Sequence, residues 1–210
     1  MYRPGAFVVD DRATLHEMIR SRVFATLALV DGDRVRFAYA PVVIDADGGL
    51  GTIRFHLARA NKVAVLADGA QLSVSFVGPD AYVSPDWYAS EGQVPTWNYV
   101  AVEGSGIAER LDETELHALL ADLSADEEAK LLPKKPWAMD KVPANALAAK
   151  LTAIQGFRLR FERLEGKLKL SQDKKFADFE GVLRGLDARG DAASRTVAAV
   201  MRAARKHEIS

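Results

Sequence analysis

The sequence contains no cysteine in its 210 residues. This absence excludes disulfide scaffolds, thiolate nucleophiles, cysteine-ligated zinc and iron–sulfur clusters. Histidine is also scarce. The four histidines, His16, His56, His117 and His207, lie far apart, and none forms the i, i+4 pair of a zinc protease. We therefore expect no metal site, and any chemistry has to use other groups.

Long apolar runs are missing as well. No segment approaches the roughly 18 consecutive apolar residues that a membrane helix needs, and residues 1–11 lack the apolar core of a signal peptide. We therefore expect a cytoplasmic protein. An excess of one charge is also absent, because 28 Lys and Arg stand against 29 Asp and Glu, a net charge of −1. Binding to nucleic acid would need a local basic patch.

What remains is the composition of an ordinary globular protein, with 49% hydrophobic and 27% charged residues. Residues 23–30 and 35–44 are β-rich runs around Asp31-Gly32-Asp33, which predicts a hairpin. Apolar and polar residues alternate in 52–57, which predicts a strand with one buried face. Further strands are expected at 71–77, 99–110 and 157–162.

Helical composition occurs near the start, in one insertion and at the carboxyl end. Helices are expected at 11–21, 61–67, 113–123, 144–151, 176–186 and 192–205. Because the strands are mostly consecutive, an antiparallel α+β fold is favoured over βαβ units. About six strands suggest a barrel.

The segment His56-Leu57-Ala58-Arg59-Ala60-Asn61-Lys62 places a guanidinium and an ammonium just after a strand and at the start of a short helix. Forked arginine donors, a mobile lysine and free backbone N–H groups all favour a phosphate. The simpler interpretation of this segment alone is that Arg59 and Lys62 are solvated charges and Asn61 caps the helix.

Aromatic residues make up only 8% of the chain, yet they gather in two neighbouring segments, AYVSPDWY (81–88) and VPTWNY (94–99). Ser84 can cap a short helix that starts at Pro85. The rings of Trp87, Tyr88, Trp97 and Tyr99 suit the wall of a flat ligand site. They are equally suited to a core or a dimer interface.

Lysine and leucine alternate in Gly166-Lys167-Leu168-Lys169-Leu170-Ser171-Gln172, which is followed by Asp173, a candidate helix cap. If a strand runs through this segment, Lys169 and Ser171 share a face. An amine and a hydroxyl there suit the phosphate or ring oxygens of a cofactor. The alternative is an edge strand protected by lysine.

These segments, in this order, resemble the signature blocks of the PaiB family of FMN-binding negative transcriptional regulators. HLARANK, AYVSPDWY, VPTWNY and EGKLKLSQ carry the resemblance, together with the opening MYRPGAF and the early FATL. The resemblance implies an antiparallel split β-barrel with peripheral helices over residues 1–172, and a helical extension over 173–210 packed on the same domain. It also implies a homodimer that holds FMN in two grooves at the subunit interface.

The resemblance further implies cofactor-binding residues. Arg59 and Asn61 lead as phosphate ligands, Lys62 and His56 belong to the same segment, Ala25 and Thr26 lie along the ring, and Trp97, Lys169 and Ser171 come from other edges. Many relatives carry a histidine two residues before the proline of the second strand, whereas this chain has Tyr39 before Ala40-Pro41. A role that needs imidazole at that position is in doubt.

Three functions remain open. The first is an FMN-dependent regulator or sensor, although residues 173–208 hold eight Lys or Arg against six Asp or Glu and show no helix-turn-helix signature, which gives direct DNA binding little support. The second is a flavin-dependent oxidoreductase acting on a small molecule, because the barrel resembles pyridoxamine phosphate oxidases and flavin reductases. The third is a haem-binding or partner-binding barrel without flavin, with His56 as a candidate axial ligand.

Overall fold

The computed structural model describes residues 1–209, and it describes the side chains of residues 1–205. The side chain of His207 therefore lies outside the described part. The chain forms two compact units. The barrel unit comprises Arg12–Phe76 and Glu103–Leu164, and the terminal unit comprises Met1–Asp11, Val77–Val102 and Glu165–Ser210. Two long strands, β5 (Gln71–Val83) and β6 (Thr96–Arg110), contribute residues to both units.

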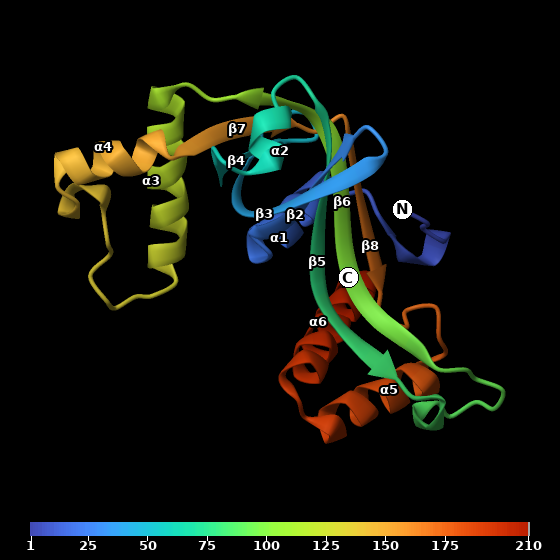
Figure 1. The fold of residues 1–210 in the computed structure, drawn as a ribbon. Helices are drawn as coiled ribbons and strands as arrows, with labels where there is room; N and C mark the ends of the chain where they lie inside the picture. Colours follow the sequence, from blue (N-terminus) through green and yellow to red (C-terminus); the bar gives the residue numbers. More distant parts are fainter. Residues whose placement is uncertain (210) are drawn as a thin grey trace. The chain divides into compact units, whose positions relative to one another are not determined.

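The barrel unit is built on a partly closed ring of antiparallel strands (Figure 1). Its other strands are β2 (Phe24–Asp31), β3 (Arg34–Asp45), β4 (Thr52–Ala58) and β7 (Ile154–Arg160). The strand order is β5-β2-β3-β4-β7, and β6 pairs with β7 as well. Hydrogen bonds between Ala108 and residues 69 and 70 bring β6 beside the start of β5. The antiparallel α+β barrel expected from the sequence is confirmed, although the sheet has eight strands in the described part of the chain where about six were expected.

The core of this unit follows from the alternation of residues along β4 and β7. Phe55 and Phe157 lie directly opposite each other, are fully buried, and stack with ring centroids 5.6 Å apart. Ile53 and Leu159 form the next buried pair in the same register. The intervening residues of β4 point to the other face, as the alternation predicted.

Helices cover that other face. The barrel unit contains α1 (Arg12–Ser21), α2 (Lys62–Leu66), α3 (Glu113–Ala129), η3 (Met139–Lys141) and α4 (Ala144–Thr152). Both α3 and α4 pack on β7, and Leu111, Leu116, Leu119 and Leu151 form their buried cluster. Arg54 binds Asp45 at 2.6 Å and Asp122 of α3 at 2.8 Å, which ties α3 to the sheet. A capping box between Asp112 and Glu115 starts α3.

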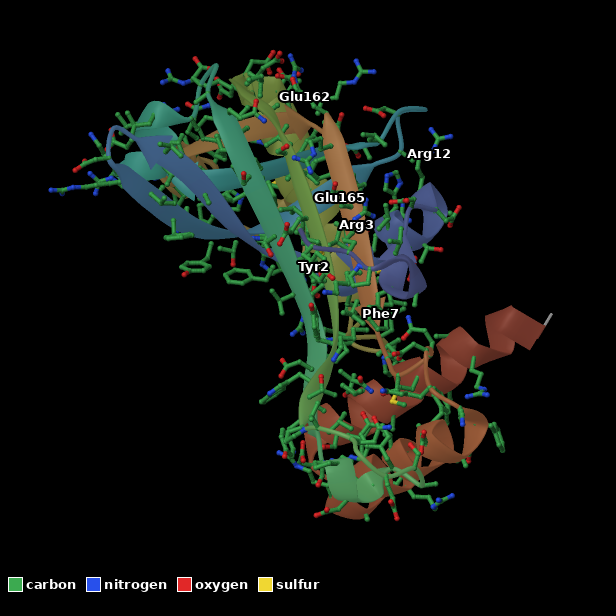
Figure 2. All side chains as sticks on the ribbon, turned by 90° about the vertical axis from the view of Figure 1, so that its right-hand side faces the viewer. Tyr2, Arg3, Phe7, Arg12, Glu162 and Glu165 are labelled. Carbon is green, nitrogen blue, oxygen red and sulfur yellow. The ribbon has the colours of Figure 1, made fainter. Side chains whose placement is uncertain are left out.

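The terminal unit joins both ends of the chain. Its strands follow the order β1-β8-β6-β5, with β1 (Val8–Val9) and β8 (Arg163–Lys169). Its helical elements are η1 (Gly5–Phe7), η2 (Pro85–Trp87), α5 (Phe176–Arg189) and α6 (Ala192–Ile209). Figure 2 shows Tyr2, Arg3 and Glu165 in this unit. The Met1 ammonium lies 2.9 Å from the Glu165 carboxylate, and the Arg3 guanidinium lies 3.6 Å from it.

Three local expectations for this unit were wrong. Asp173 does not cap α5, because the helix starts at Phe176 after Lys175, and no side chain caps it. The lysine-rich strand β8 is not an edge strand, since it lies between β1 and β6. Ser171 does not share a strand face with Lys169, because β8 ends at Lys169 and Ser171 has a left-handed φ of 61°. The expected division at residues 172 and 173 stays a prediction.

Candidate functional site

The turn after β4 carries the residues expected to bind phosphate. The Arg59 backbone N–H donates to the Ala153 carbonyl at 2.9 Å, and the Asn61 N–H donates to the Ala58 carbonyl at 2.9 Å. These two bonds fix the turn between β4 and α2. Arg59 and Lys62 are exposed, and within residues 1–205 neither side chain has a hydrogen-bond or ion-pair partner. Two unpaired cations therefore flank one short turn.

Asn61 is the residue that starts α2. Its side-chain oxygen accepts the Val63 N–H at 2.9 Å and so forms an N-cap. The simpler interpretation of this segment, in which Asn61 caps the helix, predicted this bond. This bond uses the acceptor of the amide and one of the N–H groups at the helix start. The Asn61 Nδ2 donor stays available for an anion, and Arg59 and Lys62 carry the positive charge of this corner.

His56 precedes this turn, on β4, and lies opposite Gly156 of β7. Its Nδ1 is buried and is the one buried side-chain nitrogen or oxygen without a partner among the described residues. Burial lowers the pKa of His56 because the charged imidazolium loses its hydration.

Arg59 also lines a pocket of about 220 Å³ that reaches α3 and α4. Asp112, Glu113 and Gln155 line the same pocket. The Gln155 amide donates to the carbonyls of Leu111 and Gly156, so it is used in the fold. Two carboxylates on this wall give the pocket mixed charge. An anion beside Arg59 is therefore better accommodated on the side of the turn away from α3.

The strand β2 places Ala25 and Thr26 on opposite faces. Ala25 is buried, so its side chain belongs to the barrel core. Thr26 is half-buried and lies directly opposite Tyr39 of β3, which is 62% exposed. Helix α2 contacts β2, β3 and β4. The turn with Arg59, Asn61 and Lys62, which we call the phosphate corner, therefore belongs to the same unit as these strands. Tyr39, which stands where many relatives carry a histidine, is therefore the exposed neighbour of Thr26.

The remaining predicted site residues belong to the terminal unit. The Lys169 ammonium donates to the Trp97 carbonyl at 2.8 Å and to the Thr96 hydroxyl. Burial lowers the pKa of Lys169, and the charges of Lys167 and Lys174 act in the same direction. Trp97 is 53% exposed, and its ring meets Tyr82 edge-on with centroids 6.1 Å apart. A cationic amine and an exposed indole thus lie together.

Ser171 is placed differently from this pair. It is buried and exchanges hydrogen bonds with the Asn98 side chain at 3.0 and 3.1 Å. Its hydroxyl is therefore used inside the terminal unit. Asn98 was not predicted from the sequence, although a polar residue inside a β-rich run between Trp97 and Tyr99 was a usable signal.

An apolar surface on β2 and β3 was also missed. The register places Thr26 opposite Tyr39, Ala28 opposite Phe37 and Val30 opposite Val35. These residues, with Phe24, point away from the barrel core, and the largest of them are more than half exposed. We refer to the residues Phe24, Thr26, Ala28, Val30, Val35, Phe37 and Tyr39 as the β2–β3 face. The sequence signal was alternation in which both sets of residues are largely apolar.

Residues 1–163 match the family described as "Putative FMN-binding domain". The chain belongs to this family. Along its whole length it is 27% identical to the protease synthase and sporulation protein PAI 2 of Bacillus subtilis, over 100% of both chains. It is 29% identical to an uncharacterized protein of Emericella nidulans, over 80% of this chain and 81% of the relative. The resemblance to PaiB read from the four motifs is confirmed.

Solved structures of proteins with low sequence identity share this fold. The FAD and heme binding protein of Mycobacterium smegmatis aligns with a TM-score of 0.59 and 16% identity, covering 85% of this chain and 80% of that one. The flavocytochrome Anf3 of Azotobacter vinelandii aligns with a TM-score of 0.54 and 14% identity, covering 77% and 68%. At this identity the likeness establishes the split-barrel fold alone.

FMN is the cofactor of the FMN-binding family to which the chain belongs. The residues at the turn after β4 fit the phosphate of this group, because Arg59 and Lys62 provide two cations that have no ion pair within the described residues. When bound, FMN supplies the redox chemistry of its ring. Among the described residues, none of the helices combines the length and the apolar character that a membrane span requires.

Proposed function

We propose that this protein is a cytoplasmic FMN-dependent regulator or sensor that holds the FMN phosphate at Arg59 and Lys62. The observation that carries the proposal is the pair of unpartnered cations on the turn fixed by the backbone bonds of Arg59 and Asn61. Guanidinium donors match phosphate oxygens, and the mobile lysine adds a second charge. Asn61 acts mainly by starting α2 and thereby setting the direction of Lys62.

The regulatory role rests on likeness to the Bacillus subtilis relative, whose name connects it with protease synthesis and sporulation. FMN binding alone also suits an oxidoreductase acting on a small molecule, because the flavin carries that chemistry. Steady oxidation of NADH or NADPH with FMN turnover would favour the enzyme. FMN that binds without turnover, and whose reduction changes the affinity for a partner, would favour the sensor.

The β2–β3 face supports a homodimer. Val30 is 72% exposed, Phe24 63%, and Phe37 58%. A contiguous apolar surface of this kind marks a protein interface more often than a free surface. A second copy of the chain is the proposed occupant, because two identical antiparallel faces can bury the same rings against one another by twofold symmetry.

FMN titration of purified protein tests the cofactor claim. Saturable binding of one FMN per chain is expected. Arg59→Ala should weaken FMN binding by about 1.5–3 kcal/mol, because a charge-assisted contact to phosphate is lost. Arg34→Ala is the matched control, since Arg34 is an exposed arginine at the turn between β2 and β3. Equal affinities for the two variants would remove Arg59 from the site.

Native mass measurement tests the dimer separately. Phe37→Glu places a charge in the middle of the β2–β3 face and should produce monomers. Val94→Glu changes an equally exposed apolar residue of the terminal unit, 70% exposed, and should leave the dimer intact. A Phe37→Glu protein that stays dimeric would exclude this face as the interface while leaving the FMN result untouched.

A further inference from the structure

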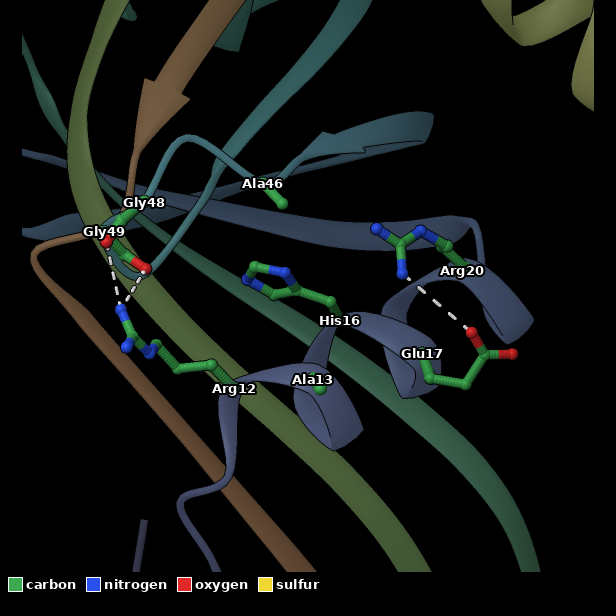
Figure 3. A pocket seen from close by; sticks show the side chains of 8 residues that line it. All are labelled: Arg12, Ala13, His16, Glu17, Arg20, Ala46, Gly48 and Gly49. Carbon is green, nitrogen blue, oxygen red and sulfur yellow. Dashed lines mark hydrogen bonds and ion pairs between the residues drawn. The ribbon is translucent and has the colours of Figure 1, made fainter.

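A second pocket of the barrel unit lies between α1 and the turn that joins β3 to β4 (Figure 3). Its volume is about 530 Å³. Pockets of this size accommodate small metabolites. Arg59, Asn61 and Lys62 do not line it, so it is separate from the phosphate corner on which the proposed function rests.

One face of α1 forms the cationic wall of this pocket. Arg12, His16 and Arg20 are spaced four residues apart and therefore lie along the same side of the helix. From Arg12 to Arg20 the helix rises about 12 Å. Figure 3 shows the two guanidiniums on either side of the His16 ring. The pocket thus has a positive group at each end.

The two arginines keep most of their donors available. Arg12 uses one terminal nitrogen, Nη1, to donate to the carbonyls of Gly48 at 3.0 Å and Gly49 at 3.1 Å. Its Nε and Nη2 have no partner among residues 1–205. Arg20 has one ion pair in the same part of the chain, to Glu17 at a distance of 3.9 Å, which exceeds a hydrogen bond.

The centre of the pocket is held in place. His16 is only 6% exposed, and its Nε2 lies 2.9 Å from the Leu50 carbonyl. Because a carbonyl can only accept, Nε2 carries the hydrogen of this bond. Opposite α1, the pocket wall includes Gly48 and Gly49, which have no side chains to fill the space. A Cβ at Gly48 would meet no atom within 4 Å, so the space beside this glycine is open.

The nearby carboxylates do not neutralise both ends. Asp47 is bonded to the Thr52 hydroxyl at 2.6 Å and to the Gly49 N–H at 3.1 Å. Glu17 lines the pocket, but its side chain is 76% exposed and its contact with Arg20 is long. A ligand carboxylate that binds Arg20 therefore displaces only a weak, solvent-screened ion pair.

We propose that this pocket binds an elongated dicarboxylate, with one carboxylate at Arg12 and the other at Arg20. Arginine's planar fork matches a carboxylate in two parallel hydrogen bonds, and two forks at the ends of one helix face require two anionic groups rather than one. His16 lies between them, against the middle of the ligand. The site is independent of FMN, so its test does not depend on the proposed function.

Calorimetric titration of the FMN-supplemented protein with malonate, succinate, glutarate and adipate tests the proposal. Acetate and inorganic phosphate serve as probes with one anionic group. Saturable binding is expected for the diacids, with an optimum at one chain length and at least tenfold weaker binding of acetate. Binding that is equal for acetate and all diacids, or strongest for phosphate, would overturn the dicarboxylate assignment.

Variants locate the binding. Arg20→Ala should weaken the preferred diacid at least tenfold, and the pair with Glu17 is the one hydrogen bond or ion pair that Arg20 loses within the described residues. Glu17→Gln should tighten binding several-fold because it removes the competing carboxylate. Arg34→Ala, an exposed arginine that does not line this pocket, should leave the affinity unchanged. Loss of binding in Arg34→Ala, or no change in Arg20→Ala, would place the diacid elsewhere and overturn the proposal.

Discussion

The indole ring of Trp87 packs directly on the backbone of Gly185 in α5. A Cβ at residue 185 would overlap the ring atoms of Trp87, and a Cβ at Gly181, one turn earlier, would overlap the Trp87 carbonyl oxygen. The two glycines therefore form a shallow site on the helix that receives the residue ending η2. This contact joins the aromatic segment of the sequence to the carboxyl-terminal helices within the terminal unit.

Gly185→Ala is expected to destabilise the protein by roughly 1–3 kcal/mol, because the added methyl group forces the indole or α5 to move. An alanine in a helix otherwise has the better intrinsic propensity, so a loss of stability isolates the steric effect. Urea unfolding measures the change. Gly5→Ala is the control, since a Cβ at Gly5 meets no atom within 4 Å. Combining Gly185→Ala with Trp87→Ala should recover part of the loss, and strict additivity of the two losses would contradict the contact.

We expect the buried His56 to make the protein less stable in mild acid. Burial lowers its pKa in the folded protein below the usual value near 6.5. The unfolded chain therefore binds a proton at a higher pH than the folded one, and the stability that His56 contributes is fully present above about pH 6.5 and falls as the pH drops toward the folded pKa. The slope from one such proton is at most about 1.4 kcal/mol per pH unit.

Unfolding free energies of the protein and of His56→Leu, measured between pH 4 and 8, test this linkage. The difference between the two curves should change below about pH 6.5 and be constant above it. Histidine ring signals in an NMR titration give the pKa directly. Parallel curves across the whole range would show that His56 is protonated equally in both states.

Asp178 acts at lower pH. Its carboxylate accepts the Ser90 hydroxyl at 2.8 Å and the Ser90 N–H at 2.8 Å, and these bonds hold its pKa below the usual value. The stability it contributes is therefore present above the pKa of the unfolded chain, near 4, and disappears as the pH falls through the folded pKa. Ser90→Ala should raise the pKa of Asp178 toward that of the unfolded chain, and the stability lost in acid should therefore become smaller. An NMR titration of the carboxyl carbon checks it, with Ser105→Ala, in the barrel unit, as a control that leaves the pKa unchanged.

Sequence reasoning succeeded where the signal is local. The alternation around Phe55 and the side chain of Asn61 act on their own neighbours, so the strand and the helix cap could be predicted. The position of β8 between two strands depends on β1, formed by the distant residues Val8 and Val9, and the lysine pattern alone resembled an edge. Ser171 likewise bonds to Asn98, 73 residues away, which no local pattern encodes.

The β2–β3 face and the pocket at α1 likewise depend on contacts that local sequence patterns do not indicate. The residues on both sides of β2 and β3 are largely apolar, so periodicity could not indicate which side is exposed. The spacing of Arg12, His16 and Arg20 was readable as a helical stripe, but the facing wall at Gly48 comes from a turn 36 residues away from Arg12. A pocket requires both walls, and only tertiary structure brings them together.

Gly51 packs against the His16 ring. Its φ is +99°, and a Cβ there would lie 2.7 Å from His16 Nε2 and 3.0 Å from Ile44 Cδ1. Gly51→Ala should therefore cost roughly 2–5 kcal/mol, the sum of backbone strain and overpacking. Gly48→Ala, at φ +82° with open space around it, should show the backbone part alone. A larger loss of unfolding free energy in Gly51→Ala, which becomes smaller in the His16→Ala background, would confirm that this glycine fixes the ring at the centre of the pocket. Equal losses in the two variants would mean that the His16 ring moves aside without cost.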